Sequence, residues 1–387
     1  MKKASISLAL LLATALAIVA AAFASAGGKA APTASSTALA SCKSPTIGLA
    51  APITGPAASI GEEQLHWALF EVARYNSQHK THIKMIQGDT QLPNTAQATL
   101  VGQQFASDSR ILGVVGPAGS QEVLAVGTTF KHAHMPYVSM SATGVELTNG
   151  TRPSFFRVVP SDAVQGLTDG NYMANQLKTK KVVIIDDQTT YSTGLAASTK
   201  KALEAKGVTV ASQSVSQQQS DFSSLITGIA GDTDVVFLPW QLAAKAQVFG
   251  QQLQAQGKRA IIFGSDGLFG PAEFYIEGSY ISTFGPDIHE VAEDAGIVKA
   301  YEAKYGKFGT FGPPAYLATQ VMLDAVNNAC KDGKATRAEV VGWMRKTNLK
   351  STILGTPLSF TKLGDVNGGN FYIYRVEAGR YHYKRVK

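Results

Sequence analysis

The chain has 387 residues, of which 45% are hydrophobic and 16% are charged, and its formal net charge is +7 at pH 7. The basic residues are dispersed, apart from short clusters at residues 178–181 and 383–387. A nucleic-acid-binding protein gathers them on one element with aromatic residues between them. The dispersed charge therefore argues against nucleic acid as a partner and favours a solvated surface.

The N-terminus has the pattern of an export signal. Lys2 and Lys3 precede an uncharged, mostly apolar stretch that ends in Ala24-Ser25-Ala26. This predicts a signal peptide over residues 1–26, cut at the small residues, with an uncleaved membrane anchor as the alternative. Residues 27–42 are rich in Ala, Ser and Thr and predict a flexible leader. We expect an exported protein at the periplasmic or extracellular face of the cell membrane.

Cys42 and Cys330 are the two cysteines of the chain. An even count in an exported protein favours a disulfide. The alternative is a lipid anchor, because Leu39-Ala40-Ser41-Cys42 fits the pattern at which bacterial lipoproteins are cut and acylated. That cut normally follows the apolar core of the signal directly, whereas residues 27–38 intervene here.

Strand-like and helix-like patterns alternate along the chain. Apolar runs typical of strands begin near residues 46, 82, 111, 136, 181, 208, 234, 260 and 280. Helical periodicity separates them, as at Leu65, Ala68, Leu69 and Val72. This alternation predicts an α/β fold of doubly wound parallel sheets with right-handed crossovers. Residues 43–387 are enough for two lobes.

The C-terminal part has a different pattern. Pro313-Pro314 opens a predicted helix that stops at Gly333. Residues 355–360 and 370–383 alternate apolar and polar side chains around the turn-forming residues 365–369. We expect these two segments to form a hairpin.

Small hydroxyl residues follow two of the predicted strands. Ser120 comes after the strand at residue 111, and Ser139, Ser141 and Thr143 come at the end of the next. Tyr191 lies just beyond the strand at residue 181. The carboxyl ends of parallel strands meet at one edge of a sheet, where such folds bind small ligands. A helix cap at Ser120 and a turn hydroxyl at Thr143 are the structural alternatives.

Motifs for other chemistries are absent from the sequence. There is no phosphate-binding loop and no nucleophile elbow, and Gly264-Ser265-Asp266-Gly267 only partly resembles the latter. His132 and His134 are two residues apart, so their rings would point in different directions on a helix. We therefore expect no catalytic residue, no metal and no cofactor, and a protein that is not an enzyme.

Residues 46–56, Thr-Ile-Gly-Leu-Ala-Ala-Pro-Ile-Thr-Gly-Pro, resemble the opening strand and turn of the branched-chain (Leu/Ile/Val-type) amino-acid binding proteins of bacterial ABC transporters. Five further landmarks match in order: Gly116-Pro117 with Ser120; residues 139–148; Phe156-Arg157 with Asp162, Gln165 and Gly166; residues 187–194; and Gly355 with Phe360 and Gly364-Asp365. The resemblance covers residues 45–387.

This resemblance implies a type I periplasmic binding protein, with two lobes joined by three hinge crossings. Lobe 1 would comprise residues 43–160 and 285–348, and lobe 2 would comprise residues 161–284 and 349–387. The implied function is the solute-binding component of an ABC importer, monomeric and working with a membrane permease. A ligand-sensing receptor subunit of the same fold is the alternative.

The resemblance also implies a ligand site. Ser120 and Thr143 would donate to a ligand carboxylate, and Ser141, followed by Ala142, would offer its carbonyl to an ammonium. Tyr191 and Asp266 would reach the ammonium from the second lobe. The alternative for Asp266 is a loop cap.

Three further positions of the implied site would contact the ligand side chain. Where leucine-type members have aromatic residues, this chain has Ile60 and, after the strand at residue 234, Trp240-Gln241. Branched-chain specificity therefore does not carry over. A polar or aromatic amino acid, another carboxylic acid and a small amide stay open. For Trp240, ordinary packing inside the lobe is the alternative.

Overall fold

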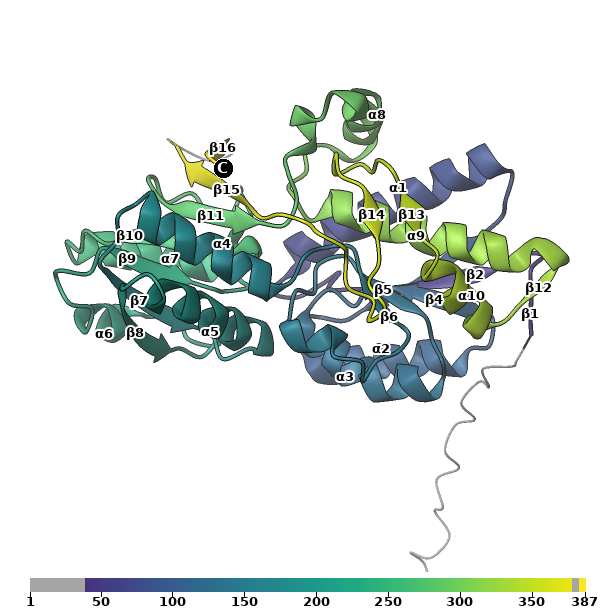
Figure 1. Ribbon diagram of the computed structural model, residues 1–387, viewed down its shortest axis with the longest axis horizontal. Coiled ribbons are helices and arrows are strands. Elements are labelled where there is room, and N and C mark those ends of the chain that lie inside the picture. The colour runs from purple at the N-terminus through teal and green to yellow at the C-terminus, as the bar shows by residue number, and fades with distance from the viewer. Residues whose placement is uncertain (1–38, 378–382) are drawn as a thin grey trace, which may run out of the picture. The chain divides into compact units, whose positions relative to one another are not determined.

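The computed structural model describes residues 39–377 and 383–387, which belong to one compact unit (Figure 1). The predicted signal peptide and residues 27–38 of the predicted leader lie outside these residues. In the part of the chain that is described, no helix has both the length and the apolar character needed to cross a membrane.

The first half of the chain builds a parallel five-stranded sheet. Its strand order is β3-β2-β4-β5-β6. The strands are β2 Thr46–Ala51, β3 Lys84–Asp89, β4 Ile111–Val115, β5 Tyr137–Ser139 and β6 Phe155–Arg157. The helices packed on it are α1 Ala58–His79, α2 Thr95–Ser107, α3 Ser120–His132, α9 Gly312–Ala329 and α10 Arg337–Met344.

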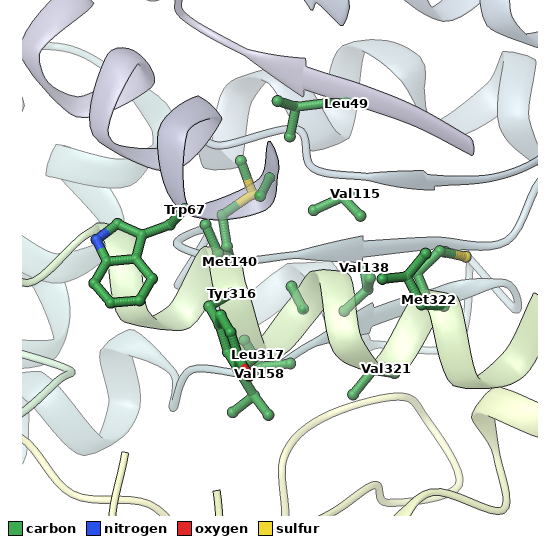
Figure 2. Close-up of a cluster of buried hydrophobic side chains, with 14 of the residues drawn as sticks. Leu49, Trp67, Val115, Val138, Met140, Val158, Tyr316, Leu317, Val321 and Met322 are labelled. Atoms are coloured by element: carbon green, nitrogen blue, oxygen red, sulfur yellow. The ribbon is translucent and has the colours of Figure 1, made fainter. Parts of the chain in front are cut away.

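Helices cover both faces of this sheet. The strand residues that point to either face are apolar, so both faces must be shielded from water. Leu49, Val115 and Val138 pack with α1 and α9 in one core, where Met322 also lies (Figure 2). Their neighbours, such as Val114, pack with α2 and α3 in a second core. The α/β prediction is confirmed.

A seven-stranded sheet of order β16-β15-β11-β10-β9-β7-β8 forms the other half. Its strands are β7 Lys181–Asp186, β8 Thr209–Ser214, β9 Val235–Leu238, β10 Ile261–Gly264, β11 Tyr280–Thr283, β15 Tyr372–Val376 and β16 Tyr383–Arg385. Helices α4 Asp162–Asn175 and α5 Thr190–Glu204 pack on one face, while α6 Ser223–Thr227 and α7 Ala243–Ala255 pack on the other. Strands β7 to β11 are parallel to one another. β15 is antiparallel to both of its neighbours, β11 and β16.

The predicted C-terminal hairpin is wrong in its pairing. β15 pairs with β11 and β16, while β14 Leu358–Ser359 pairs with β13 Asn348–Leu349. Alternating side chains indicate a half-buried strand, but they do not identify the strand beside it.

The remaining elements are short or peripheral. They are β1 Ala40–Ser41, paired with β12 Lys334–Ala335; α8 Ala295–Tyr305; and the 3₁₀ turns η1 Val145–Thr148, η2 Asp266–Leu268, η3 Ile288–Glu290, η4 Ala292–Asp294 and η5 Cys330–Asp332.

A disulfide joins Cys42 to Cys330 with a Cα–Cα distance of 5.5 Å. It lies beside the β1–β12 pair and ties the segment before β2 to the end of α9. The predicted disulfide is therefore confirmed. A bonded Cys42 has no thiol for acylation, so the structure argues against the lipid anchor.

The chain changes sheets three times: after β6, after β11 and before β15. This arrangement agrees with two lobes joined by three crossings. The lobe boundaries at residues 160, 284 and 348 stay a prediction. Asp365 still contacts Arg157 at the end of β6, which favours a third boundary nearer β15.

Candidate functional site

A small cavity of about 20 Å³, here named the inner cavity, lies at the carboxyl ends of the strands. Both lobes contribute to its wall. The lining residues are Ile60, Leu92, Ala118, Gly119, Ser120, Ser141 and Phe311 from the first lobe, and Tyr191, Gln241, Asp266 and Gly267 from the second.

The turn after β4 brings the backbone close to β2. Gly116 has a φ of +101°, and a Cβ there would lie 2.1 Å from the Ala50 carbonyl oxygen. Only glycine fits this position. The turn leads through Pro117 to Ser120 at the start of α3, so the first amides of that helix lie at the cavity wall. Helix N-termini of this kind favour anions.

Hydroxyl groups connect the two loops at the ends of β4 and β5. Ser139 Oγ donates to the Pro117 carbonyl at 2.6 Å, and Ser141 Oγ donates to the Ala118 carbonyl at 2.9 Å. Ser120 Oγ accepts from the Gly144 amide at 3.0 Å. The Ser120 hydroxyl therefore keeps its proton available for another acceptor.

The Arg157 side chain holds the loop after β5 through hydrogen bonds. Its guanidinium donates to the Gly144 carbonyl at 2.8 Å and to the two carboxylate oxygens of Asp365 at 2.7 and 2.9 Å. It also donates to Thr148 Oγ1 at 3.2 Å. Three of the landmarks seen in the sequence thus meet at one bidentate ion pair, in which Arg157 is buried and Asp365 is partly exposed.

Tyr191 and Asp266 form the opposite wall of the inner cavity. The Tyr191 hydroxyl donates to Asp266 Oδ1 at 2.7 Å and lies 2.7 Å from Ser265 Oγ. Burial raises the pKa of Asp266 to about 6, an effect that hydrogen bonds from Tyr191 and Gln165 partly offset. A buried carboxylate with a raised pKa is suited to a cationic partner.

Sequence reasoning missed a group of buried acids on α4. Burial raises the pKa of Asp162 to about 8 and the pKa of Asp169 well above its ordinary value. A chain of hydrogen bonds runs from Gln165 through Ser282 to Asp169, at 3.0 and 2.9 Å. The i, i+3, i+7 spacing of these α4 residues was the available signal, since it places them on one helix face.

Gln121 of α3 and Gln241 after β9 connect the two lobes. Gln121 Nε2 donates to Gln241 Oε1 at 2.7 Å, and Gln241 Nε2 lies 3.4 Å from Gln121 Oε1. Both side chains are buried. The Gln241 amide that was expected to meet a ligand side chain is therefore already hydrogen-bonded to the other lobe.

The structure brings together six of the nine expected ligand-binding residues: Ile60, Ser120, Ser141, Tyr191, Gln241 and Asp266. Trp240 is not on this wall. Its Nε1 donates to the Ile185 carbonyl at 2.6 Å, and its ring packs against Phe222 and Phe249. The expected ligand contact of Trp240 is replaced by core packing, because the strand end turns the indole toward α6 and α7.

Ala142 and Thr143 lie behind the cavity wall, with 1% and 0% of their surface exposed. The Thr143 hydroxyl is hydrogen-bonded to the carboxyl of the neighbouring Asp162 and lowers its pKa, against the larger effect of burial. The contact of Thr143 with a ligand therefore stays a prediction.

Two α/β lobes with a cavity between their strand ends are typical of a solute-binding protein. The family model described as "Periplasmic binding protein" matches residues 44–380. The chain therefore belongs to the periplasmic binding protein family and is not an enzyme.

Two curated relatives span nearly the whole chain. It is 28% identical over 356 residues to the "Amino acid binding protein" of Pseudomonas aeruginosa, covering 87% of this chain and 91% of that protein. It is also 28% identical to "Leu/Ile/Val-binding protein homolog 2" of Brucella abortus, covering 87% and 92%.

Solved structures agree in fold. The leucine binding protein LivK from Thermotoga maritima superposes with a TM-score of 0.81 at 20% identity, covering 88% of this chain and 97% of that one. The substrate binding protein LivJ from Streptococcus pneumoniae, in complex with isoleucine, gives 0.78 at 25% identity, covering 89% and 100%. The family resemblance inferred from the sequence is confirmed.

Proposed function

We propose that this protein is the extracytoplasmic binding component of an ABC importer and that it captures an α-amino acid between its lobes. The proposal rests on one observation: hydrogen-bond donors and a carboxylate face each other across the inner cavity. Hydroxyl and amide donors lie on the first lobe, and the Tyr191–Asp266 pair lies on the second. The names of the curated relatives support the same ligand class.

The ligand carboxylate lies on the first lobe in this proposal. Ser120 donates the hydroxyl proton that its bond to Gly144 leaves available. Amides at the start of α3 add further donors, as helix N-termini do for anions. Thr143, on the loop after β5, is proposed as the second hydroxyl donor.

The ligand ammonium lies on the second lobe. Asp266 supplies the charge, Tyr191 holds one of its oxygens, and the Ser141 carbonyl accepts from the other side. A zwitterion bound in this way touches both lobes, so it binds the closed state more tightly than the open one. Delivery of the ligand to an ABC permease by a monomeric, exported protein completes the proposal.

The variant Asp266→Asn tests the ammonium contact, because it keeps the shape and removes the charge. We expect a loss of roughly 3–5 kcal/mol for an amino acid, since the buried ammonium loses its counter-charge. The affinity for the same molecule without its amino group should change little. Calorimetry with L-phenylalanine and 3-phenylpropionate, on the wild type and the variant, measures both.

Equal losses for the two ligands would contradict the proposal. So would an unchanged affinity for L-phenylalanine. In either case Asp266 would be a structural loop residue, and the natural ligand would be a carboxylic acid without an α-amino group.

A further inference from the structure

Two successive residues that follow β9, Gln241 and Leu242, contact the first lobe from the second. The polar contact is the amide pair, in which Gln121 Nε2 donates to Gln241 Oε1 at 2.7 Å and Gln241 Nε2 lies 3.4 Å from Gln121 Oε1. The apolar contact is a small buried cluster of Leu242 with Leu92 and Ala57, separate from the larger cores of both lobes. Each of the two residues therefore has a partner on the opposite lobe.

The second lobe holds this segment in a fixed position. The backbone amide of Gln241 donates to Asp187 Oδ2 at 3.2 Å, and the preceding Trp240 is bonded through Nε1 to the Ile185 carbonyl. A Cβ on Gly267 would lie 2.3 Å from the Trp240 carbonyl oxygen, so the loop after β10 also packs closely against the segment. A contact group that is already ordered loses little conformational freedom when the lobes meet.

On the first lobe, the two partners lie beside one glycine. A Cβ on Gly119 would lie 2.7 Å from Leu92 Cδ1 and 3.5 Å from Gln121 Oε1. Gln121 is in the first turn of α3 and is buried. It does not line the inner cavity, whereas Gln241 does. Any effect of Gln121 on a ligand therefore acts through Gln241 and through the distance between the lobes.

These contacts exist only while the lobes are close together. When the lobes separate, water hydrogen-bonds the two amides, and Leu92 and Leu242 lose their apolar contact. Hydrogen bonds are stronger where apolar groups exclude water, and burial of the two leucines adds to the gain. A contact of this kind shifts the equilibrium between open and closed states toward the closed one. It raises the apparent affinity of every ligand that binds the closed state by the same factor.

We propose that Gln121 is a positioning residue: its amide pair with Gln241, flanked by Leu92 and Leu242, forms an inter-lobe latch that stabilises the closed state and slows ligand release. That the lobes close on a solute rests on the proposed function, and the assignment of these four residues goes beyond it. The latch is indifferent to the chemistry of the ligand, because Gln121 reaches the other lobe and not the inner cavity.

The variant Gln121→Leu tests the latch, because it nearly keeps the size of the side chain and removes both hydrogen bonds. Affinity should fall roughly tenfold, since the buried Gln241 amide loses its partner in the closed state. Release requires opening, so the loss should lie in the dissociation rate, with little change in the association rate. Stopped-flow fluorescence with L-leucine, L-phenylalanine and 3-phenylpropionate measures both rates. The factor should be the same for each of the three that binds.

Gln97→Leu is the matched control. Gln97 is in the first turn of α2, and its Nε2 donates to the Asp89 carbonyl at 3.3 Å within the first lobe. This variant should leave both rates unchanged. The double variant Gln121→Leu/Gln241→Leu should bind more tightly than Gln121→Leu alone, because it leaves no buried amide without a partner. A merely structural role of Gln121 within the first lobe would give no such rescue.

Three results would overturn the latch: a dissociation rate of Gln121→Leu equal to that of Gln97→Leu, a loss confined to one ligand, or a double variant that binds no better than the single one. The proposed function fails separately. If 3-phenylpropionate binds and neither amino acid does, the zwitterion proposal is wrong, and the same comparison of variants with that acid decides the latch.

Discussion

Asp266 combines burial, a hydrogen bond and neighbouring acids in one place. Its side chain is buried, Tyr191 donates to it, and burial raises its pKa to about 6 from an ordinary value near 3.8. The carboxyls of Asp162 and Asp169 interact electrostatically with it. Burial also raises the pKa values of these two carboxyls.

This raised pKa gives a pH dependence with a definite sign. Folding disfavours ionised Asp266, so its contribution to the free energy of unfolding falls as the pH rises from about 4 to about 6. An ammonium ligand needs the ionised form. Affinity for L-phenylalanine should therefore fall as the pH drops below about 6, by up to roughly tenfold per unit.

Calorimetry between pH 4.5 and 7 measures this dependence, and Asp266→Asn is the control. The variant should bind weakly, with no such dependence. A wild-type affinity that stays constant across the range would contradict the assignment of Asp266 to the ammonium.

At the scale of elements, Arg337 connects the ends of several of them. From the first turn of α10, its buried guanidinium donates to the carbonyls of Ala106 and Ala133, near the ends of α2 and α3, at 3.1 Å each. It also donates to the carbonyls of Ile111 and Asp108 at 3.0 and 2.8 Å. One side chain thus adds a donor for carbonyls near the ends of α2 and α3 and at the start of β4.

Arg337→Leu should lower the free energy of unfolding by about 3 kcal/mol or more, because several buried carbonyls lose their donor at once. Chemical denaturation measures the change. Arg110→Leu removes an exposed ion pair to Asp108 and should cost less than about 1 kcal/mol. Similar losses for the two variants would show that the Arg337 contacts contribute little.

Individual elements were predictable to different degrees. The strands at residues 46, 111 and 181 begin where the sequence indicates, because apolar runs bounded by Gly or polar residues identify buried parallel strands. The pairing of β15 was not predictable, since its partner β11 lies far away in the sequence. The side chain of Trp240 likewise depends on where α6 and α7 pack.

At the scale of the whole molecule, the disulfide closes a loop between residues 288 positions apart. Both cysteines pack with the core of the first lobe, so the bond leaves the cleft free. The double variant Cys42→Ala/Cys330→Ala should lose about 5–6 kcal/mol of stability in the chain-entropy model. Ligand affinity should stay the same.

Urea denaturation and calorimetry on this double variant check the two expectations. A stability equal to that of the wild type would mean that the β1–β12 pair alone holds the segment. A large fall in affinity would mean that the bond also positions the cleft.

The sequence by itself predicted the fold class, the family and six of the residues that line the inner cavity, and it favoured the disulfide over a lipid anchor. These depend on local periodicity, on glycine and hydroxyl residues at strand ends, and on cysteine count, all of which are written in short segments of chain. Only the tertiary structure revealed the buried acids of α4 and the Gln121–Gln241 contact between the lobes. Each of these arises where segments distant in the sequence meet, and the space between two packed lobes depends on the positions of all their side chains together.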